Sequence, residues 1–121
     1  MSIEPIVEGK ISFFVYVNSK TSRCQITKFV DSLEQDQQIK FSKRIQRWAA
    51  KGIPNNDEQF KHEQGKIFAY KQGQVRIYGF YKCKTEFVFT NGCLKKTDKA
   101  DPNELSRAEE CRLQWEKENE Q

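Results

Sequence analysis

An arginine interrupts an otherwise apolar run in the second half of the chain. Arg76 stands between Val75 and Ile77. Because successive strand residues point to opposite faces, a strand here places Arg76 and Tyr78 on one face and the two aliphatic residues in the core. A guanidinium on an open sheet face can hold a phosphate group through two parallel hydrogen bonds. The alternative is a structural ion pair with Glu86 on the neighbouring strand.

Lysines surround this arginine in the sequence. Lys71 ends the preceding predicted strand, and Lys95 and Lys96 follow just after the last one. Residues 66–100 hold eight Lys/Arg and two Asp/Glu, a net charge of +6 in a chain of net charge +4. Basic charge in one strand-rich segment, with aromatic residues between, is typical of a nucleic-acid surface. It is equally typical of lysines that keep a sheet soluble.

A proton acceptor is harder to find than the cations. The single histidine, His62, lies in a polar stretch, where a histidine is usually just solvated. Tyr78 and Tyr81 are alternatives, since one of them should face the same side as the arginine. A phenol with a pKa near 10 is a poor base unless cations lower it. Either ring could instead stack on an RNA base or fill the core.

The sequence contains no pattern typical of a metal site or a membrane protein. The four cysteines are widely spaced, no C-x-x-C pair occurs, and one histidine is too few to complete a zinc site. No apolar run approaches the roughly 20 residues of a membrane span, and residues 1–10 do not resemble a signal peptide. We therefore expect a cytoplasmic protein without metal or cofactor.

The spacing of apolar residues predicts an α+β domain with the order β-αα-βββ-α. The length of 121 residues suits one domain, with flexible ends at 1–9 and 119–121. The predicted strands cover 10–17, 66–71, 74–82 and 85–90. Two amphipathic helices start near Ser22 and before Phe41, a polar loop covers 55–65, and a last helix starts at Pro102. We expect a small twisted, mainly antiparallel sheet of four strands, with the helical hairpin on one face and the last helix at its edge or opposite face.

Two strings in this frame resemble a known toxin family. They are KQGQVRIYGFY at 71–81 and TNGCLKKTDKADP at 90–102. The first is similar to the strand of RelE/ParE toxins in which an arginine lies between hydrophobic residues. The second is similar to the Gly-x-x-Lys-Lys-Thr-x-Lys…Pro turn of the HigB-like, phage-derived branch. The helical string 29–54, which ends Ala-Lys-Gly-Ile-Pro, is similar to the helical hairpin of RelE/HigB-like toxins.

The resemblance implies a ribosome-associated or free mRNA endonuclease that is silenced by an antitoxin of helix-turn-helix type. Such an enzyme needs no metal, because the RNA supplies its own 2′-hydroxyl nucleophile and the protein stabilises charge on the phosphate. The implied residues fall into two groups. Those near the reacting phosphate are Arg76, Lys96, Lys95 and Tyr78. Those that bind RNA around it are Lys71, Lys99, Lys66 and Tyr81.

Two other functions remain compatible with the sequence. A ParE-like member shares the fold but inhibits DNA gyrase and cleaves nothing, and the Lys-Lys-Thr turn argues mildly against it. A non-catalytic RNA- or protein-binding adaptor on the same scaffold is the other, because no base is obvious. Cleavage of mRNA by purified protein would separate both from an endonuclease.

Overall fold

A computed structural model describes the chain except for residues 1–2, 19–20, 22–23, 96–100 and 120–121. The described strands are β1 (Ile3–Val7), β2 (Ser12–Tyr16), β3 (Phe60–Gln64), β4 (Ile67–Gln72), β5 (Val75–Cys83) and β6 (Glu86–Leu94). The described helices are α1 (Gln25–Asp31), α2 (Gln35–Lys51) and α3 (Pro102–Glu118). None of these helices is long and apolar enough to cross a membrane.

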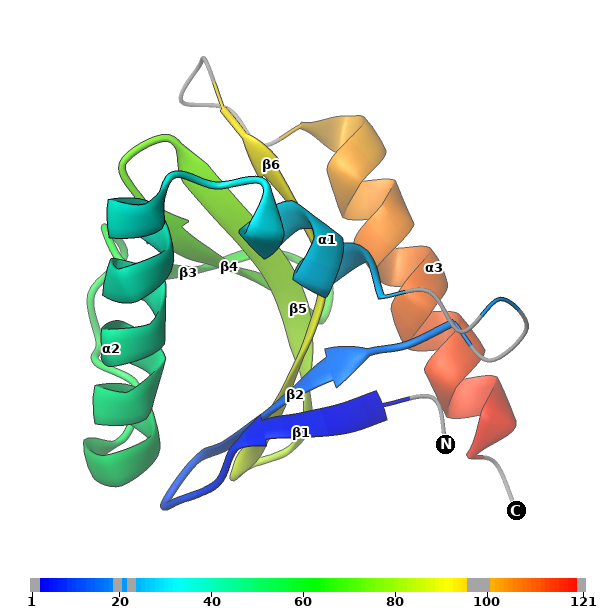
Figure 1. Cartoon of the computed structure of the whole chain (residues 1–121). Coiled ribbons are helices and arrows are strands. Elements are labelled where there is room, and N and C mark those ends of the chain that lie inside the picture. Colours follow the sequence, from blue (N-terminus) through cyan, green and yellow to red (C-terminus); the bar gives the residue numbers. More distant parts are fainter. Residues whose placement is uncertain (1–2, 19–20, 22–23, 96–100, 120–121) are drawn as a thin grey trace.

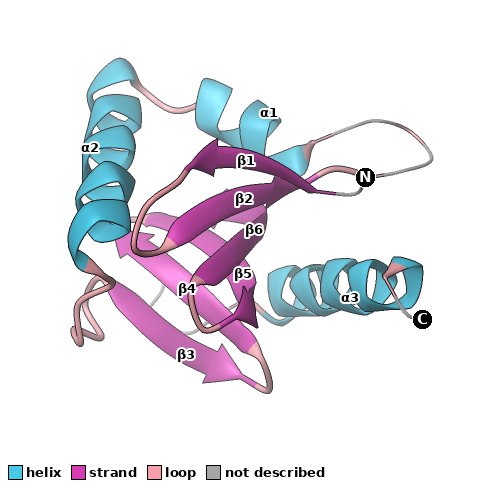
Figure 2. Cartoon of the chain, turned by 90° about the horizontal axis from the view of Figure 1, so that it is seen from below, coloured by secondary structure: helices cyan, strands magenta, loops and turns pink. Residues whose placement is uncertain are grey.

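The described strands form one twisted sheet in the order β1-β2-β6-β5-β4-β3. Neighbouring strands are antiparallel except for β2 and β6, which are parallel. Parallel neighbours need a crossover, and α1, α2 and the β3–β5 meander lie between these two in the chain. Figure 2 shows the strands fanning from β1 to β3. The expected α+β class and mainly antiparallel sheet are confirmed.

Helices cover both faces of this sheet. Figure 1 shows α2 and α3 on opposite sides of it. Trp48 of α2 and Ile26 of α1 share one buried cluster with Phe87 and Phe89 of β6. On the other face, α3 buries a second cluster. Its members include Ile67, Ala69, Tyr78, Phe80, Val88, Leu105 and Ala108. The last helix therefore lies on the opposite face, one of the two expected positions.

The sheet has two more strands than predicted, and both lie at its edges. Residues 1–9 were expected to be flexible, but Ile3–Val7 pair with β2, and Ile3 is buried. The predicted loop at 55–65 contains β3, in which Phe60 packs edge-on against Trp48. Edge strands have one unpaired side, so they tolerate polar residues and Pro5, and their apolar alternation is weak.

The central strand β6 is also longer than predicted, because a bulge carries it past Asn91. Tyr78 pairs with Asn91, but the next residue, Gly79, pairs with Phe89, so Thr90 is the extra residue. The Thr90 hydroxyl donates to the Tyr78 carbonyl at 3.2 Å. Gly79 permits the close approach, since a Cβ there would meet the Val88 carbonyl oxygen at 2.2 Å. The pairing resumes beyond the bulge and continues to Leu94.

The bulge changes which face the odd-numbered residues of β6 present. Phe87 and Phe89 belong to the cluster under α1 and α2. Beyond Thr90, the Asn91 amide donates to the Glu104 carbonyl of α3 at 3.1 Å, and Cys93 packs against the cluster under α3. A bulge shifts the phase of a strand in this way because it adds one unpaired residue.

Candidate functional site

The candidate site contains a row of paired residues that crosses three neighbouring strands. Arg76 of β5 pairs with Lys71 of β4 on one side and with Cys93 of β6 on the other. Directly paired residues have Cβ atoms about 4.5–5.5 Å apart and point to the same face. That face is the one covered by α3, because Ala69 and Tyr78, two residues along each strand, lie in the α3 cluster. The row thus lies just beyond the part of the sheet that α3 buries.

Arg76 is half-buried and held by backbone carbonyls. Its guanidinium Nη1 donates to the carbonyl oxygens of Gly73 at 2.6 Å and Val75 at 2.9 Å. The alternative ion pair with Glu86 is wrong, because Glu86 lies at the opposite end of β6 and pairs with Lys82 at 3.3 Å. Within the described part of the chain, Arg76 therefore lacks a carboxylate partner.

Lys95 joins this row from the segment that follows β6. Its backbone N–H donates to the carbonyl of Gln74 in the β4–β5 turn at 2.7 Å, and only 8 % of the residue is exposed. Lysine is almost never this buried unless it is paired. Burial lowers the pKa of Lys95, the positive charges of Arg76 and Lys71 lower it further, and Glu63 and Cys93 act in the opposite direction. The structure therefore places Lys71 and Arg76 in paired positions and Lys95 within reach of their charges.

Glu63 is the carboxylate whose charge acts on both Lys95 and Tyr78. It lies in an irregular part of the β3–β4 pairing, between His62, which pairs with Phe68, and Gln64, which pairs with Ile67, near the β3–β4 turn. Its charge raises the pKa values of both Lys95 and Tyr78. The Glu63 charge thus acts on Lys95 and Tyr78, while no ion pair joins Glu63 to Arg76 or Lys95 in the described residues.

Tyr78 lies beneath this group rather than on an open face. The face that Arg76 and Tyr78 share was expected to be exposed, but α3 covers it and leaves Tyr78 1 % exposed. The hydroxyl has no hydrogen-bond partner among the described residues. Burial raises the pKa of Tyr78, and nearby Cys93 raises it further. A phenol with a raised pKa does not serve as a general base.

A family comparison bears on this arrangement. Residues 28–112 match the model of the family described as phage-derived protein Gp49-like (DUF891). The chain belongs to this Gp49-like family. The matched segment runs from α1 into α3 and contains Glu63, Lys71, Arg76 and Lys95. Among curated proteins, none matches the chain.

Several residues implied by the toxin resemblance lie away from the site of this Gp49-like chain. Tyr81 lies on the other face, packed edge-on against Phe68 and Phe87. Lys66 lies at the β3–β4 turn, where it is 3.9 Å from Glu116 of α3. His62 contacts the Gly65 carbonyl oxygen at 2.6 Å. Lys96 and Lys99 lie outside the described residues.

Two residues of this Gp49-like chain, Glu63 and Cys93, were not predicted from the sequence. Glu63 was assigned to a loop, because only Phe60 in its strand has a clear core pattern. Alternation counted from Phe87 and Phe89 would have placed Cys93 and Lys95 on the face opposite to Arg76, and only the bulge reverses this. The strand-like residues that continue past Asn91 were the one sign in the sequence that β6 extends to Leu94. In the described residues, no group of three or more His, Cys, Asp or Glu side chains is arranged to hold a metal ion.

Proposed function

We propose that this chain is the toxin of a type II toxin–antitoxin pair and acts as an mRNA endonuclease of the HigB-like branch of RelE/ParE toxins. The observation that carries the proposal is the convergence of Lys71, Arg76 and Lys95 on one face, without an ion pair among the described residues. Like charges held together repel one another, and a bound phosphate relieves that repulsion. Membership of a phage-derived family supports the same proposal.

In this proposal, the cations hold the scissile phosphate of RNA. The Arg76 guanidinium has donors left after its two backbone contacts, and these bind a non-bridging oxygen. Lys95 lies close to Arg76 and Lys71, and its ammonium stabilises the negative charge that grows on the phosphorane. Lys96 and Lys99, outside the described residues, are proposed to add charge from the same segment.

The reaction forms one bond and breaks one. The 2′-oxygen attacks phosphorus, the bond from phosphorus to the 5′-oxygen breaks, and the products are a 2′,3′-cyclic phosphate and a 5′-hydroxyl. We assign the proton of the 2′-hydroxyl to the Glu63 carboxylate, whose charge acts on Lys95. The leaving 5′-oxygen gains a proton from water or a lysine. No metal or cofactor enters this chemistry.

The partners follow from the same surface. An acidic segment of a helix-turn-helix antitoxin would cover Lys71, Arg76 and Lys95, and opposite charges make such association fast and salt-sensitive. The substrate is cytoplasmic mRNA, free or on the ribosome. Antitoxin affinity should therefore fall between low and high salt.

The deciding experiment is an RNA-cleavage assay with purified wild type, Arg76→Ala and Arg76→Lys. Arg76→Ala should lower kcat about 10²–10³-fold, by analogy with loss of an oxyanion-hole donor. Arg76→Lys should recover only part of this, since lysine cannot form two parallel hydrogen bonds. Arg107→Ala on α3 is the matched control and should cleave like wild type.

Thermal unfolding of the same variants separates chemistry from folding. All should melt within a few degrees of wild type, because Arg76 is half-buried and bonds only to carbonyls of its own turn. Full cleavage by Arg76→Ala would remove it from the site. If wild type cleaves no RNA but inhibits gyrase, the chain acts like ParE.

A further inference from the structure

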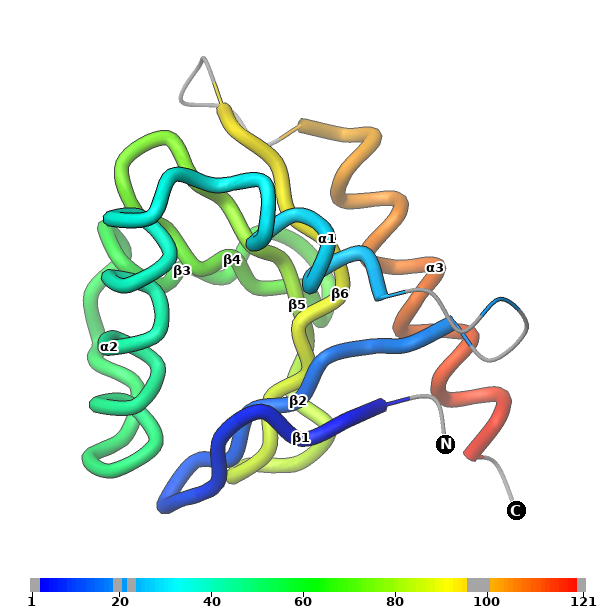
Figure 3. Tube along the Cα trace, in the orientation of Figure 1, coloured from blue at the N-terminus to red at the C-terminus, as the bar shows by residue number. Residues whose placement is uncertain are grey.

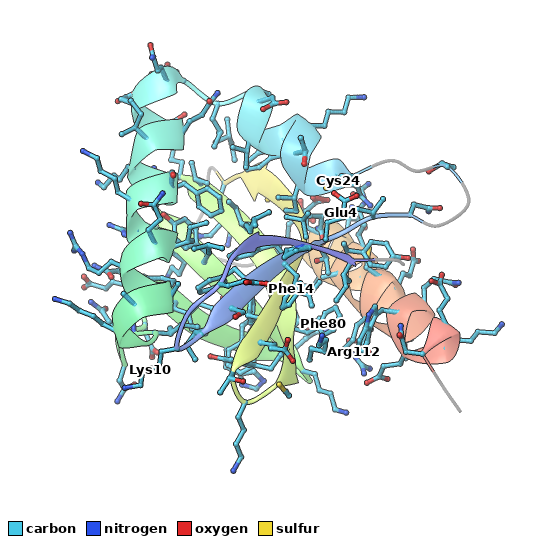
Figure 4. All side chains as sticks on the ribbon, turned by 60° about the horizontal axis from the view of Figure 1, so that its bottom comes forward. Glu4, Lys10, Phe14, Cys24, Phe80 and Arg112 are labelled. Atoms are coloured by element: carbon cyan, nitrogen blue, oxygen red, sulfur yellow. The ribbon has the colours of Figure 1, made fainter. Side chains whose placement is uncertain are left out.

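One side of α2 carries a second basic surface, which contacts residues 66–100 through Arg44. Its residues are Lys40, Lys43, Arg44, Arg47 and Lys51. Their spacing of three or four places them along one side of the helix, over a length of about 16 Å. Figure 4 shows nitrogen-tipped side chains projecting from α2 away from the sheet. None of the five forms an ion pair with another described residue.

This basic stripe borders two adjoining hollows. One, of about 390 Å³, is lined by Lys40, Lys43, Arg44 and Arg47 with Asp36 and Ile39. The other, of about 290 Å³, shares Asp36 and Lys40 with it and reaches Gln72, Gly73 and Gln74. Ile39, 46 % exposed, offers an apolar surface between the cations.

The second hollow borders the β4–β5 turn, whose backbone contacts two of the candidate catalytic residues. Its lining includes Gly73, whose carbonyl accepts from Arg76, and Gln74, whose carbonyl accepts from the Lys95 backbone. Arg44 in the stripe donates to the Lys71 carbonyl at 3.2 Å. Figure 3 shows the β4–β5 turn beside the first turns of α2, where Gln72 donates to the Gln37 carbonyl at 3.2 Å.

We propose that the α2 stripe binds the phosphate backbone of the substrate RNA strand as it leaves the site over the β4–β5 turn. The inference rests on the proposed function, because its occupant is the strand being cleaved. Single-stranded RNA fits the stripe by charge, and its bases provide flat apolar faces for Ile39. The stripe then sets affinity for long RNA without touching the reacting phosphate.

The test compares two double variants in the full chain. Lys40→Ala/Lys43→Ala removes two cations of the stripe, and alanine favours the helix. Lys28→Ala/Lys117→Ala removes two exposed lysines from α1 and α3 and is the matched control. Fluorescence anisotropy measures the Kd of a single-stranded RNA of about 20 nucleotides across salt concentrations, a length chosen to cover several phosphate contacts. Cleavage kinetics are recorded on that RNA and on a trinucleotide.

We expect the stripe variant to bind the long RNA roughly tenfold more weakly, with a salt slope lower by about 1.4 for two lost phosphate contacts. Its KM should rise for the long RNA while kcat, and all trinucleotide kinetics, stay as in wild type. The control should match wild type. Unchanged RNA affinity, or an equal loss on both substrates, overturns the proposal. The proposal is also overturned if the stripe variant binds RNA like wild type and loses affinity only for an acidic partner protein. If wild type cleaves no RNA but still binds it more tightly than the stripe variant does, the catalytic function is rejected and the RNA-binding role of the stripe stands.

Discussion

At the scale of single residues, the candidate site depends on charges placed where they repel. Arg76 and Lys95 lie on one face, and the nearby Arg76 charge helps to lower the pKa of Lys95. Such an arrangement costs folding free energy and becomes favourable when an anion binds. Glu63 offsets part of the repulsion, and its carboxylate is the one proton acceptor that we assign.

Glu63→Gln tests this assignment, since it keeps the shape of the side chain and removes its basicity. We expect kcat for RNA cleavage to fall about 10²–10⁴-fold, the usual contribution of a general base. RNA affinity should stay the same or rise slightly, because one negative charge leaves a phosphate site. The measurement is single-turnover cleavage alongside RNA binding. Cleavage at the wild-type rate would assign the proton to another group.

At the scale of elements, the bulge in β6 decides which side chains meet. Without Thr90 as an extra residue, Cys93 and Lys95 would face α1 and α2, away from Arg76. The Thr90 hydroxyl bonds to the Tyr78 carbonyl at 3.2 Å and to the Asn91 amide oxygen at 2.6 Å. Bulges beside active sites commonly re-aim side chains in this way.

Thr90→Val removes that hydroxyl at nearly constant volume. Thr90 is fully buried, so the change leaves buried acceptors unpaired and should cost about 1–3 kcal/mol of unfolding free energy. Urea unfolding measures this cost, and RNA cleavage should fall severalfold because Lys95 is less firmly placed. Thr85→Val, in the exposed β5–β6 turn, is the control and should change neither quantity. Equal stability of the two variants would show that the hydroxyl does not support the bulge.

At the scale of the whole molecule, two helical layers cover the faces of one sheet and bury its aromatic residues. Burial is the largest cause that raises the pKa of each of the four tyrosines, Tyr16, Tyr70, Tyr78 and Tyr81, above 10.0. For Tyr70 it raises the pKa to about 12. A pKa that is higher in the folded state contributes stability that is complete below the unfolded pKa and is lost as pH rises through the folded value.

Alkaline titration should therefore show tyrosine ionisation coupled to unfolding. Below pH 10.0 the phenols stay neutral and stability is unaffected, whereas above it the unfolded state gains from ionising first. We expect tyrosinate absorbance and loss of circular dichroism to rise together in one transition. Tyr70→Phe should weaken the pH dependence of unfolding free energy above pH 10.0. Tyrosinate absorbance that grows near pH 10.0 while the dichroism stays native would contradict this.

The sequence alone determined the elements whose apolar pattern is strong. Phe41, Ile45 and Trp48 repeat at helical spacing and face the sheet, and Val75 and Ile77 alternate into the core as expected. Arg76 was recognised as a candidate site residue because it is a charged residue within an otherwise apolar strand. Local periodicity carries this information, since it reflects burial of one face of each element.

Only the tertiary structure decided the edges of the sheet and the composition of the site. Strands β1 and β3 bury few residues and gain their order from pairing with neighbours, so their own residues carry little signal. Tyr78 looks open in sequence, yet α3, which begins 24 residues later, covers it. The positions of Glu63 and Lys95 depend on long-range pairing and on an irregular register in each of the two strand pairs, and neither follows from local periodicity because both depend on which strands become neighbours.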